Sequence, residues 1–203
     1  SEENINLKKR KSVYLENSNY YVEDIRKLIV EKYGFDKVYK QGFTINTPLN
    51  LDLQEKATQS LRQGLIDFDK KKGWRKPLLN KKYNSNWSKN LEDYKLEDSI
   101  GWKLSIVKKV NQFSVEIETV DKIEGIIEFS SIDWTKKKFK DFLNVGDIIY
   151  AEKIKDNKFN LKQLPKVNGA ILVMDPYTGR VLALSGGFSF KNSEFNRATQ
   201  ASR

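Results

Sequence analysis

The sequence of 203 residues contains no cysteine and no histidine. Without cysteine the chain forms no disulfide and offers no thiolate nucleophile, and without histidine it lacks the most common general base and metal ligand. No apolar run approaches the roughly 18 residues that a membrane-spanning helix requires. Asp67 and Asp69 are predicted on a helix surface, and Glu116 and Glu118 in solvent on one face of a strand, so no carboxylate pair suggests general acid–base catalysis. We therefore expect no cofactor and no metal ion.

Positive charge is present but is spread along the chain. The net charge is +10, yet residues 78–165 carry 16 basic and 14 acidic side chains, a net charge of only +2. Thirty of the 37 basic residues are lysines, whereas bidentate phosphate recognition favours arginine. Basic clusters are short and occur at Lys8–Lys11, Lys70–Lys72 and Lys136–Lys138. This distribution favours a solvated lysine-rich surface over the concentrated basic stripe of a nucleic-acid-binding protein.

Two helices are predicted in the first third of the chain. After a polar lead-in over residues 1–19, apolar side chains recur at helical spacing as far as Tyr33, and Gly34 is a natural helix end. Asn50 has the side chain of an N-cap for a second helix that ends near Gly73. Residues 42–47, between the two helices, alternate in polarity, which predicts a strand.

The middle of the chain has the pattern of a small β-barrel. Five strands are predicted, at Trp102–Val110, Ser114–Val120, Gly125–Phe129, Asp147–Ile154 and Lys158–Leu164. Residues Trp134–Leu143, between the third and fourth strands, are predicted to form a short amphipathic helix. Five strands with a helix in that position are typical of the OB fold, a Greek-key barrel. Residues 77–100 are rich in Asn, Lys and Ser, which indicates a linker with one helical turn.

The last part of the chain predicts a β-hairpin. Two apolar runs, Ala170–Met174 and Arg180–Ser185, flank the turn sequence Asp-Pro-Tyr-Thr-Gly. Pro176 presets the φ angle of a type I turn, and Gly179 can take the positive φ that closes the hairpin. Because both runs are apolar at nearly every position, we expect a hairpin buried on both faces. Where its sheet is incomplete, the open faces and edges are expected to pair with another segment or to make the chain self-associate.

Three consecutive pieces of this region resemble the opening of the transpeptidase domain of class A penicillin-binding proteins, type 1A in particular. They are the Asp-Pro-x-Thr-Gly hairpin, the Val-Leu-Ala-Leu-x-Gly-Gly strand and the sequence Phe-Asn-Arg-Ala-Thr-Gln-Ala. Residues 44–54 are similar to the family's Thr-Thr-Leu-Asp-x-x-Leu-Gln motif, with Asn50 where Asp is usual.

The resemblance implies an α+β architecture, in which a small OB-like barrel is inserted in a partial, β-lactamase-like transpeptidase domain with flanking helices. Its expected parts are a lead-in (residues 1–19), a helical linker with the start of the transpeptidase domain (20–76), the OB-like insert (77–166), and the first hairpin with the approach to the nucleophile helix (167–203).

In this family the whole polypeptide is a peptidoglycan synthase with glycosyltransferase and D,D-transpeptidase activities. The resemblance implies an upstream membrane anchor and a place at the periplasmic face of the bacterial inner membrane. The nucleophilic serine of Ser-x-x-Lys would follow just after Arg203, so this segment is expected to be a regulatory and scaffolding region without the nucleophile. By resemblance, Phe195, Asn196 and Arg197 lead into the nucleophile helix and support the site. Implied partners are peptidoglycan precursors and an outer-membrane lipoprotein activator that docks on the OB-like insert.

Look-alikes of the catalytic motifs occur in other contexts. Ser105–Lys108 lies in a predicted strand, where residues i and i+3 point to opposite faces. Ser88–Asn90 lies in the predicted linker, and Tyr177–Gly179 forms the hairpin turn. We expect none of the three to be catalytic. Gly186-Gly187 lacks the third glycine of a phosphate loop and is interpreted as a turn.

An alternative function is a standalone OB module that binds single-stranded nucleic acid. Such barrels stack bases on aromatic side chains over a basic groove. Phe113, Phe129, Trp134 and Phe159 could supply such platforms. The low net charge of the barrel region and the unexplained flanking sequence favour the synthase segment.

Overall fold

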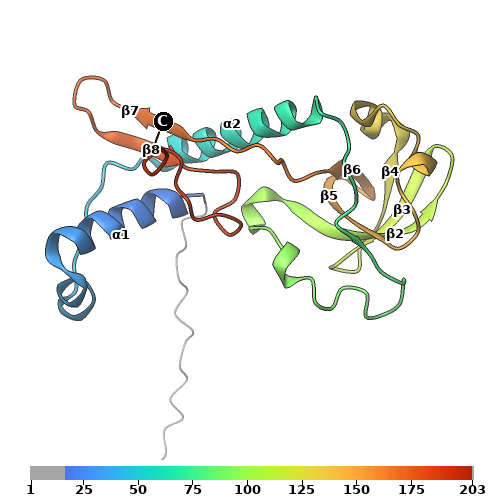
Figure 1. Ribbon diagram of the computed structural model, residues 1–203, viewed down its shortest axis with the longest axis horizontal. Helices are drawn as coiled ribbons and strands as arrows, with labels where there is room; N and C mark the ends of the chain where they lie inside the picture. The colour runs from blue at the N-terminus through green and yellow to red at the C-terminus, as the bar shows by residue number, and fades with distance from the viewer. Residues whose placement is uncertain (1–16, 203) are drawn as a thin grey trace, which may run out of the picture.

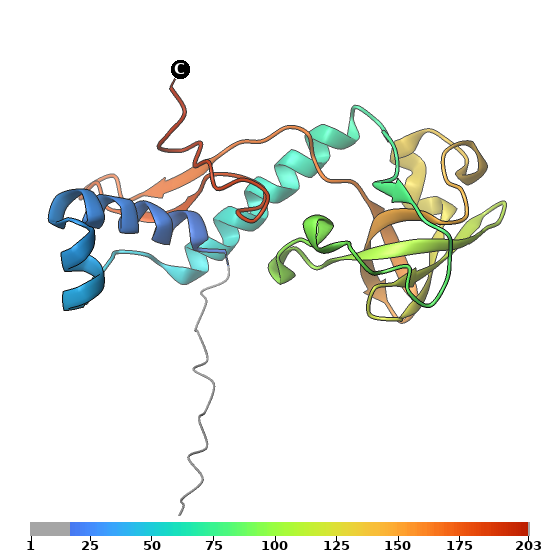
Figure 2. The same cartoon turned by 60° about the horizontal axis from the view of Figure 1, so that its bottom comes forward.

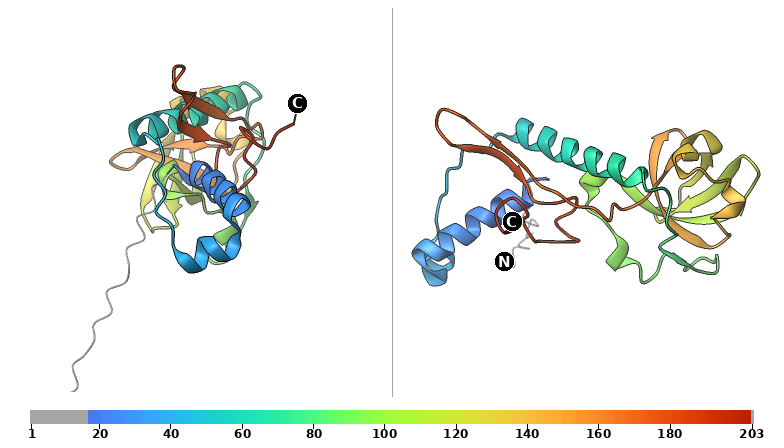
Figure 3. Two further views of the ribbon diagram at one scale, coloured as in Figure 1. Left: turned by 90° about the vertical axis from the view of Figure 1, so that its left-hand side faces the viewer. Right: turned by 45° about the horizontal axis from the view of Figure 1, so that its top comes forward.

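The structure, a computed structural model, describes residues 17–202, so the predicted cluster Lys8–Lys11 lies outside the described residues. The molecule is elongated, with two helices and a hairpin at one end and a β-barrel at the other (Figure 1). The longer helix runs from the hairpin toward the barrel, and the segment that returns from the barrel to the hairpin runs beside it (Figure 2). Viewed along the long axis, the barrel lies behind the helices and the hairpin (Figure 3).

The two helices follow the periodicity of the sequence. Helix α1 (Asn19–Tyr33) ends before Gly34, as predicted, and buries Tyr20. Helix α2 (Leu51–Lys70) begins after Asn50, whose side-chain oxygen accepts a hydrogen bond from the backbone N–H of Leu53 at 3.0 Å. Because this bond satisfies one of the free N–H groups of the first turn, the predicted N-cap is confirmed.

The connection between α1 and α2 differs from the prediction. Lys37–Gln41 form a π-helix, and residues 42–47 pair with no strand in the described part of the chain. Phe43 and Ile45 are both 42% exposed. Alternating polarity fits an extended backbone, but pairing also needs a neighbouring strand, which this segment does not meet here.

The predicted hairpin is formed by β7 (Ile171–Met174) and β8 (Val181–Ser185), with Leu172 opposite Leu184. In the turn, Gly179 has a φ of +69° and donates its N–H to the carbonyl of Asp175 at 2.9 Å. Helix α2 packs against both strands. The prediction of burial on both faces is wrong for this chain, because exposure alternates along β7 and reaches 45% at Leu172 and 52% at Met174.

The other part is a closed five-stranded barrel, and each strand begins within one residue of its predicted start. Its strands are β2 (Trp102–Val110), β3 (Ser114–Thr119), β4 (Glu124–Glu128), β5 (Asp147–Lys155) and β6 (Lys158–Lys162). The order is β5-β2-β3-β4-β6, and antiparallel pairing of β5 with β6 closes the barrel. Strands β4 and β6 are parallel. This connectivity is that of the OB fold.

The link between the third and fourth strands is not the single helix predicted at Trp134–Leu143. Two short 3-10 helices, Phe129–Thr135 and Phe139–Asp141, occupy it instead. Lys136 between them has a φ of +55°. A left-handed residue interrupts a continuous α-helix, so the amphipathic pattern is divided between two shorter turns.

Residues 77–100 are not the linker that their composition predicts. They contain a two-residue strand, β1 (Leu79–Asn80), that pairs with β5, and two further 3-10 helices, Glu92–Tyr94 and Asp98–Ile100. Trp87 and Leu91 are 1% and 3% exposed. These side chains cover an apolar cluster on one side of the barrel wall, while the alternate residues of the strands fill the barrel interior.

The incoming and outgoing ends of the barrel meet at Asp69, in the last turn of α2. Asp69 is 3% exposed, and its carboxylate accepts hydrogen bonds from Arg75 Nη1 at 2.8 Å, Gln163 Nε2 at 2.9 Å and the backbone N–H of Lys166 at 3.1 Å. Arg75 also donates its backbone N–H to Gln163 Oε1 at 2.9 Å. The prediction of Asp69 as a helix-surface residue is therefore wrong, because the segment that buries it lies about ninety residues further along the chain.

We expect Asp69→Ala to lower the free energy of unfolding by about 2–4 kcal/mol, because it leaves Arg75 and Gln163 without their shared acceptor. Urea denaturation measures the loss. Asp67→Ala is the matched control, since Asp67 is exposed on the same helix, and should change stability by no more than about 0.5 kcal/mol. Equal effects of the two substitutions would contradict the role of Asp69.

Candidate functional site

Helix α2 holds the hairpin through the side-chain amide of Gln54. Gln54 Oε1 accepts the backbone N–H of Leu184 at 2.9 Å, and Gln54 Nε2 donates to the carbonyl of Leu184 at 3.0 Å. The same Nε2 donates to Asn17 O at 2.9 Å. Gln54 is 1% exposed. Its amide exchanges with the backbone of β8 the two hydrogen bonds that a residue of a neighbouring strand would make. Sequence reasoning singled out Gln54 only within a family motif, without a role.

Beyond β8, the chain turns back and packs residues 195–197 onto the two glycines that end the hairpin. Arg197 donates its backbone N–H to Gly186 O at 3.3 Å, and its Nη1 donates to the same oxygen at 3.3 Å. A Cβ atom added to Gly186 would lie 2.2 Å from Asn196 Oδ1 and 2.7 Å from Asn196 Cα. One added to Gly187 would lie 2.4 Å from the hydroxyl of Tyr20. The two glycines are thus more than a turn, because they admit this close approach.

The three residues predicted to support the site have different surroundings. Asn196 is 2% exposed; its Oδ1 accepts the N–H of Ala198 at 3.1 Å, and its Nδ2 has no partner among the described residues. The guanidinium of Arg197 lies 5.5 Å from the ring centroid of Phe195, which is 47% exposed. The structure therefore brings Asn196 and Arg197 together at Gly186 and leaves Phe195 at the surface.

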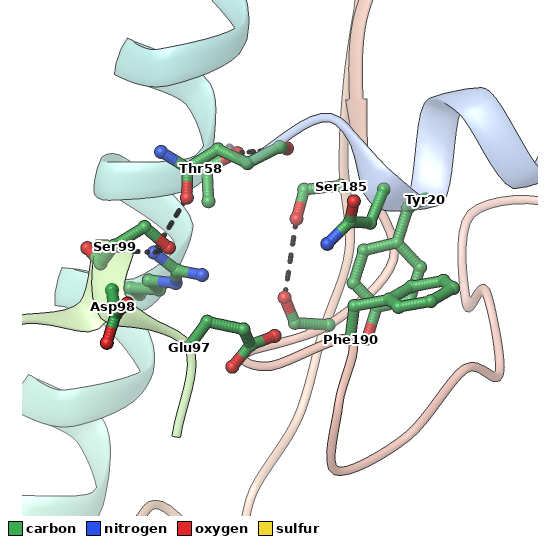
Figure 4. A pocket seen from close by; sticks show the side chains of 11 residues that line it. Tyr20, Thr58, Glu97, Asp98, Ser99, Ser185 and Phe190 are labelled. Carbon is green, nitrogen blue, oxygen red and sulfur yellow. Dashed lines mark hydrogen bonds between the residues drawn. The ribbon is translucent and has the colours of Figure 1, made fainter. Parts of the chain in front are cut away.

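A pocket of about 170 Å³ lies where both helices, residues 97–99 and residues 185–190 meet (Figure 4). Arg62 on α2 crosses this junction. Its Nε donates to Phe188 O at 2.9 Å, and its Nη1 donates to Asn17 Oδ1 at 2.9 Å. Tyr20 on α1 donates its hydroxyl to Ser193 O at 2.6 Å. Burial lowers the pKa of the Arg62 guanidinium and raises that of the Tyr20 hydroxyl to about 12, so Tyr20 stays a hydrogen-bond donor at neutral pH.

The arrangement is a set of satisfied hydrogen bonds that holds four segments in one place. Sequence reasoning missed Arg62 and Glu97, which line the pocket. Neither lies in a recognisable motif, and their partners are distant in the sequence. Within residues 17–202 no group of acidic side chains could hold a metal ion, and no helix is long and apolar enough to cross a membrane.

The catalytic look-alikes lie outside this junction. Ser105 and Lys108 are both on β2, where Ser105 is fully buried and Lys108 pairs with Glu124. Ser88–Asn90 lies in the turns that cover the barrel, and Tyr177–Gly179 lies in the hairpin turn, with Tyr177 96% exposed.

The strand carboxylate Glu118 differs from its prediction. Glu116 is partly exposed, but Glu118 is 8% exposed. Its carboxylate accepts hydrogen bonds from Trp87 Nε1 at 2.7 Å, Tyr83 Oη at 2.8 Å and Lys122 Nζ at 2.9 Å. Burial by itself would raise the pKa of Glu118, but these three hydrogen bonds outweigh it and lower the pKa to about 2. The segment that covers the barrel is thus anchored through a buried anion.

The four aromatic residues of the nucleic-acid alternative do not form one platform. Phe159 is 2% exposed and belongs to the barrel interior. Trp134 packs against Trp74, with ring centroids 6.0 Å apart. Only Phe113 and Phe129 of the four are exposed, at 68% and 37%. Base stacking needs accessible aromatic faces over a basic groove, which this distribution does not supply.

Known proteins of similar sequence match both the barrel and the segments that flank it. Residues 74–167 match the family described as the penicillin-binding protein OB-like domain. The chain is 38% identical to penicillin-binding protein 1A of Rickettsia prowazekii, over 97% of this chain and 25% of that protein. Against penicillin-binding protein 1A of Rickettsia bellii it is 38% identical, over 98% of this chain and 26% of that protein.

A solved structure shows the same fold. The crystal structure of penicillin-binding protein 1A from Haemophilus influenzae matches 90% of this chain and 28% of its own, with a TM-score of 0.77 and 25% sequence identity. The chain belongs to the class A penicillin-binding proteins of type 1A. It spans about a quarter of the length of the curated relatives it matches. The predicted family and the α+β fold with an OB-like barrel are therefore confirmed.

Gly186→Ala should destabilise this penicillin-binding protein segment by about 2–3 kcal/mol, because the new Cβ meets the backbone of Asn196 as well as its side chain. Gly64→Ala is the control. Gly64 lies in α2, and no atom lies within 4 Å of the position that a Cβ would take. Its replacement by Ala should therefore raise the free energy of unfolding by about 0.5–1 kcal/mol. Urea unfolding of both variants measures whether Gly186→Ala lowers the free energy of unfolding and Gly64→Ala raises it. An unchanged midpoint for Gly186→Ala would refute the close approach.

The segment should also lose stability in acid through Glu118. Its pKa is depressed on folding, so its contribution is fully present above the ordinary value of 4.5 and is lost as the pH falls from there toward 2. Urea unfolding at a series of pH values measures this loss. Glu118→Gln should remove much of it, whereas Glu116→Gln, at a partly exposed site, should leave it intact. Identical pH profiles for the wild type and Glu118→Gln would contradict the prediction.

Proposed function

We propose that this chain is the scaffolding and regulatory segment of a bifunctional peptidoglycan synthase. The observation that carries the proposal is the packing of Asn196 and Arg197 on Gly186, at the point where the family resemblance expects the chain to approach the nucleophile helix. The sequence similarity to penicillin-binding protein 1A of two Rickettsia species supports the same role. In this proposal the segment positions catalytic residues that lie elsewhere in the protein.

The proposed division of the chain follows from this role. Residues 20–76 form the helical linker and the start of the transpeptidase domain, residues 77–166 the OB-like insert, and residues 167–203 the first hairpin and the approach to the nucleophile. The contacts of Gln54 with β8 support a domain that is begun by α2, interrupted by the insert, and resumed by the hairpin.

In the whole protein, the proposed reaction is peptide cross-linking beside glycan polymerisation. A serine of Ser-x-x-Lys attacks the carbonyl of a D-alanyl-D-alanine stem peptide and expels the terminal D-alanine. The acyl-enzyme then passes its acyl group to an amine of a second stem peptide, and penicillins trap the same serine. The chemistry requires the serine to stand in one geometry, because small misplacements of a reacting group reduce the rate strongly.

The proposed setting is the periplasmic face of the bacterial inner membrane, with the anchor supplied by another part of the protein. The proposed partner of the OB-like insert is an outer-membrane lipoprotein activator. The barrel offers the surface for such a contact, since it stands at the end of the molecule away from the hairpin (Figure 1).

The test uses the longer protein of which this chain is a segment. Asn196→Ala and Arg197→Ala should lower the rate constant of labelling by fluorescent penicillin by about ten- to a hundredfold, because they loosen the approach to the nucleophile. Arg180→Ala, an exposed arginine in the hairpin turn, is the matched control and should label normally. Normal labelling of both Asn196→Ala and Arg197→Ala would reject the proposed role of these residues.

A further inference from the structure

We propose that Glu97 is a positioning residue that couples the OB-like insert to residues 188–197, and this role rests on the proposed function. Glu97 belongs to the turns that cover the barrel, whereas residues 188–197 approach the nucleophile. We call the contact between residues 95–97 and residues 188–191 the clasp.

The carboxylate of Glu97 holds residues 188–191 at two points. Its Oε2 accepts the hydroxyl of Ser189 at 2.6 Å, and its Oε1 accepts the backbone N–H of Lys191 at 3.0 Å. Lys191 returns the contact, since its Nζ donates to the carbonyl of Lys95 at 2.7 Å. Hydrogen bonds to a charged acceptor are the strong ones, so this pair of contacts fixes a short stretch of backbone. Figure 4 shows Glu97 between helix α2 and the loop that carries Phe190.

On the insert side, the residues next to Glu97 are anchored in the barrel wall. The hydroxyl of Tyr150, on β5, donates to Tyr94 O at 2.6 Å. Leu96 is 6% exposed and belongs to the apolar cluster on the barrel wall. Phe188 inserts into this same cluster, with its ring centroid 5.5 Å from that of Trp102. We therefore expect a displacement of the barrel relative to α2 to move residues 188–191 as well, because both are packed on the same apolar cluster.

On the hairpin side, residues 188–193 are anchored on helix α1. The hydroxyl of Tyr20 donates to the carbonyl oxygen of Ser189 at 3.1 Å and to that of Ser193 at 2.6 Å. Tyr20 in turn stands against Gly187, next to Gly186, on which Arg197 packs. A continuous set of contacts thus links Glu97, through Tyr20 and the two glycines, to Asn196 and Arg197. The insert can influence the nucleophile through this path without touching substrate.

Amide hydrogen exchange of the 203-residue chain tests the clasp directly. Glu97→Ala should speed exchange of the Lys191 N–H by about tenfold or more, since its acceptor is lost. Glu97→Gln, which keeps one oxygen acceptor, should speed it less. Asp93→Ala is the control, because Asp93 is an exposed acidic residue of the preceding 3-10 helix, Glu92–Tyr94, and its replacement should leave Lys191 unchanged. Exchange in the barrel strands should be equal in all variants. Unchanged exchange at Lys191 in Glu97→Ala would overturn the clasp.

Fluorescent-penicillin labelling of the longer protein tests the positioning role. Glu97→Ala should lower the rate constant of labelling by about tenfold, with the fraction of protein finally labelled unchanged, whereas Asp93→Ala should match the wild type. A lower labelled fraction at an unchanged rate constant would mean that Glu97 only stabilises the fold, and would overturn the role. If the wild-type longer protein takes no penicillin, the proposed function fails and the positioning role falls with it, while the exchange experiment still decides whether the clasp exists.

Discussion

The architecture depends on one buried carboxylate, that of Asp69. It lies at the end of α2, where the chain leaves for the barrel, and it binds both Arg75 on the outgoing side and Gln163 on the returning side. A buried anion is tolerated only when donors surround it, so the two segments cannot separate without exposing unpaired groups. The barrel is therefore fixed to the helix at one polar point, and every contact further along the junction relies on that placement.

Helix α2 transmits this constraint along its length by two kinds of contact. At one end Gln54 pairs with the backbone of Leu184, which sets the hairpin against the helix. Toward the other end Leu65 and Ile66 pack against the apolar cluster of the barrel wall. The apolar contacts supply area and are indifferent to small rotations, whereas the amide and carboxylate contacts have directions. Their combination gives the two parts of the molecule a defined orientation.

The sequence predicts the barrel strands and both helices well, because apolar alternation, N-caps and turn residues act over a few positions. It does not predict the polar side chains whose partners are remote. Glu118 has the pattern of an exposed strand position, but Trp87 and Tyr83, from the segment that covers the barrel, donate hydrogen bonds to its carboxylate. Asn196 and Arg197 were identified by family resemblance alone, and their packing on Gly186 appears only in three dimensions. The error at residues 77–100 has the same origin, since a polar composition conceals a few aromatic and aliphatic anchors such as Trp87 and Leu91.

The contact between Arg75 and Gln163 has a consequence for how such a molecule can arise. In the chain, the barrel is an insertion between helix α2 and the hairpin. Its two ends, at Arg75 and Gln163, are joined by a hydrogen bond. The entropy of closing a loop grows only slowly with its length, so a folded module with adjoining ends adds little to the closure cost that a short turn would carry. Such a site accepts the acquisition, exchange or loss of a whole domain while the host keeps its own register. In evolutionary terms, the junction at Asp69 is a site at which a whole domain can be inserted or removed.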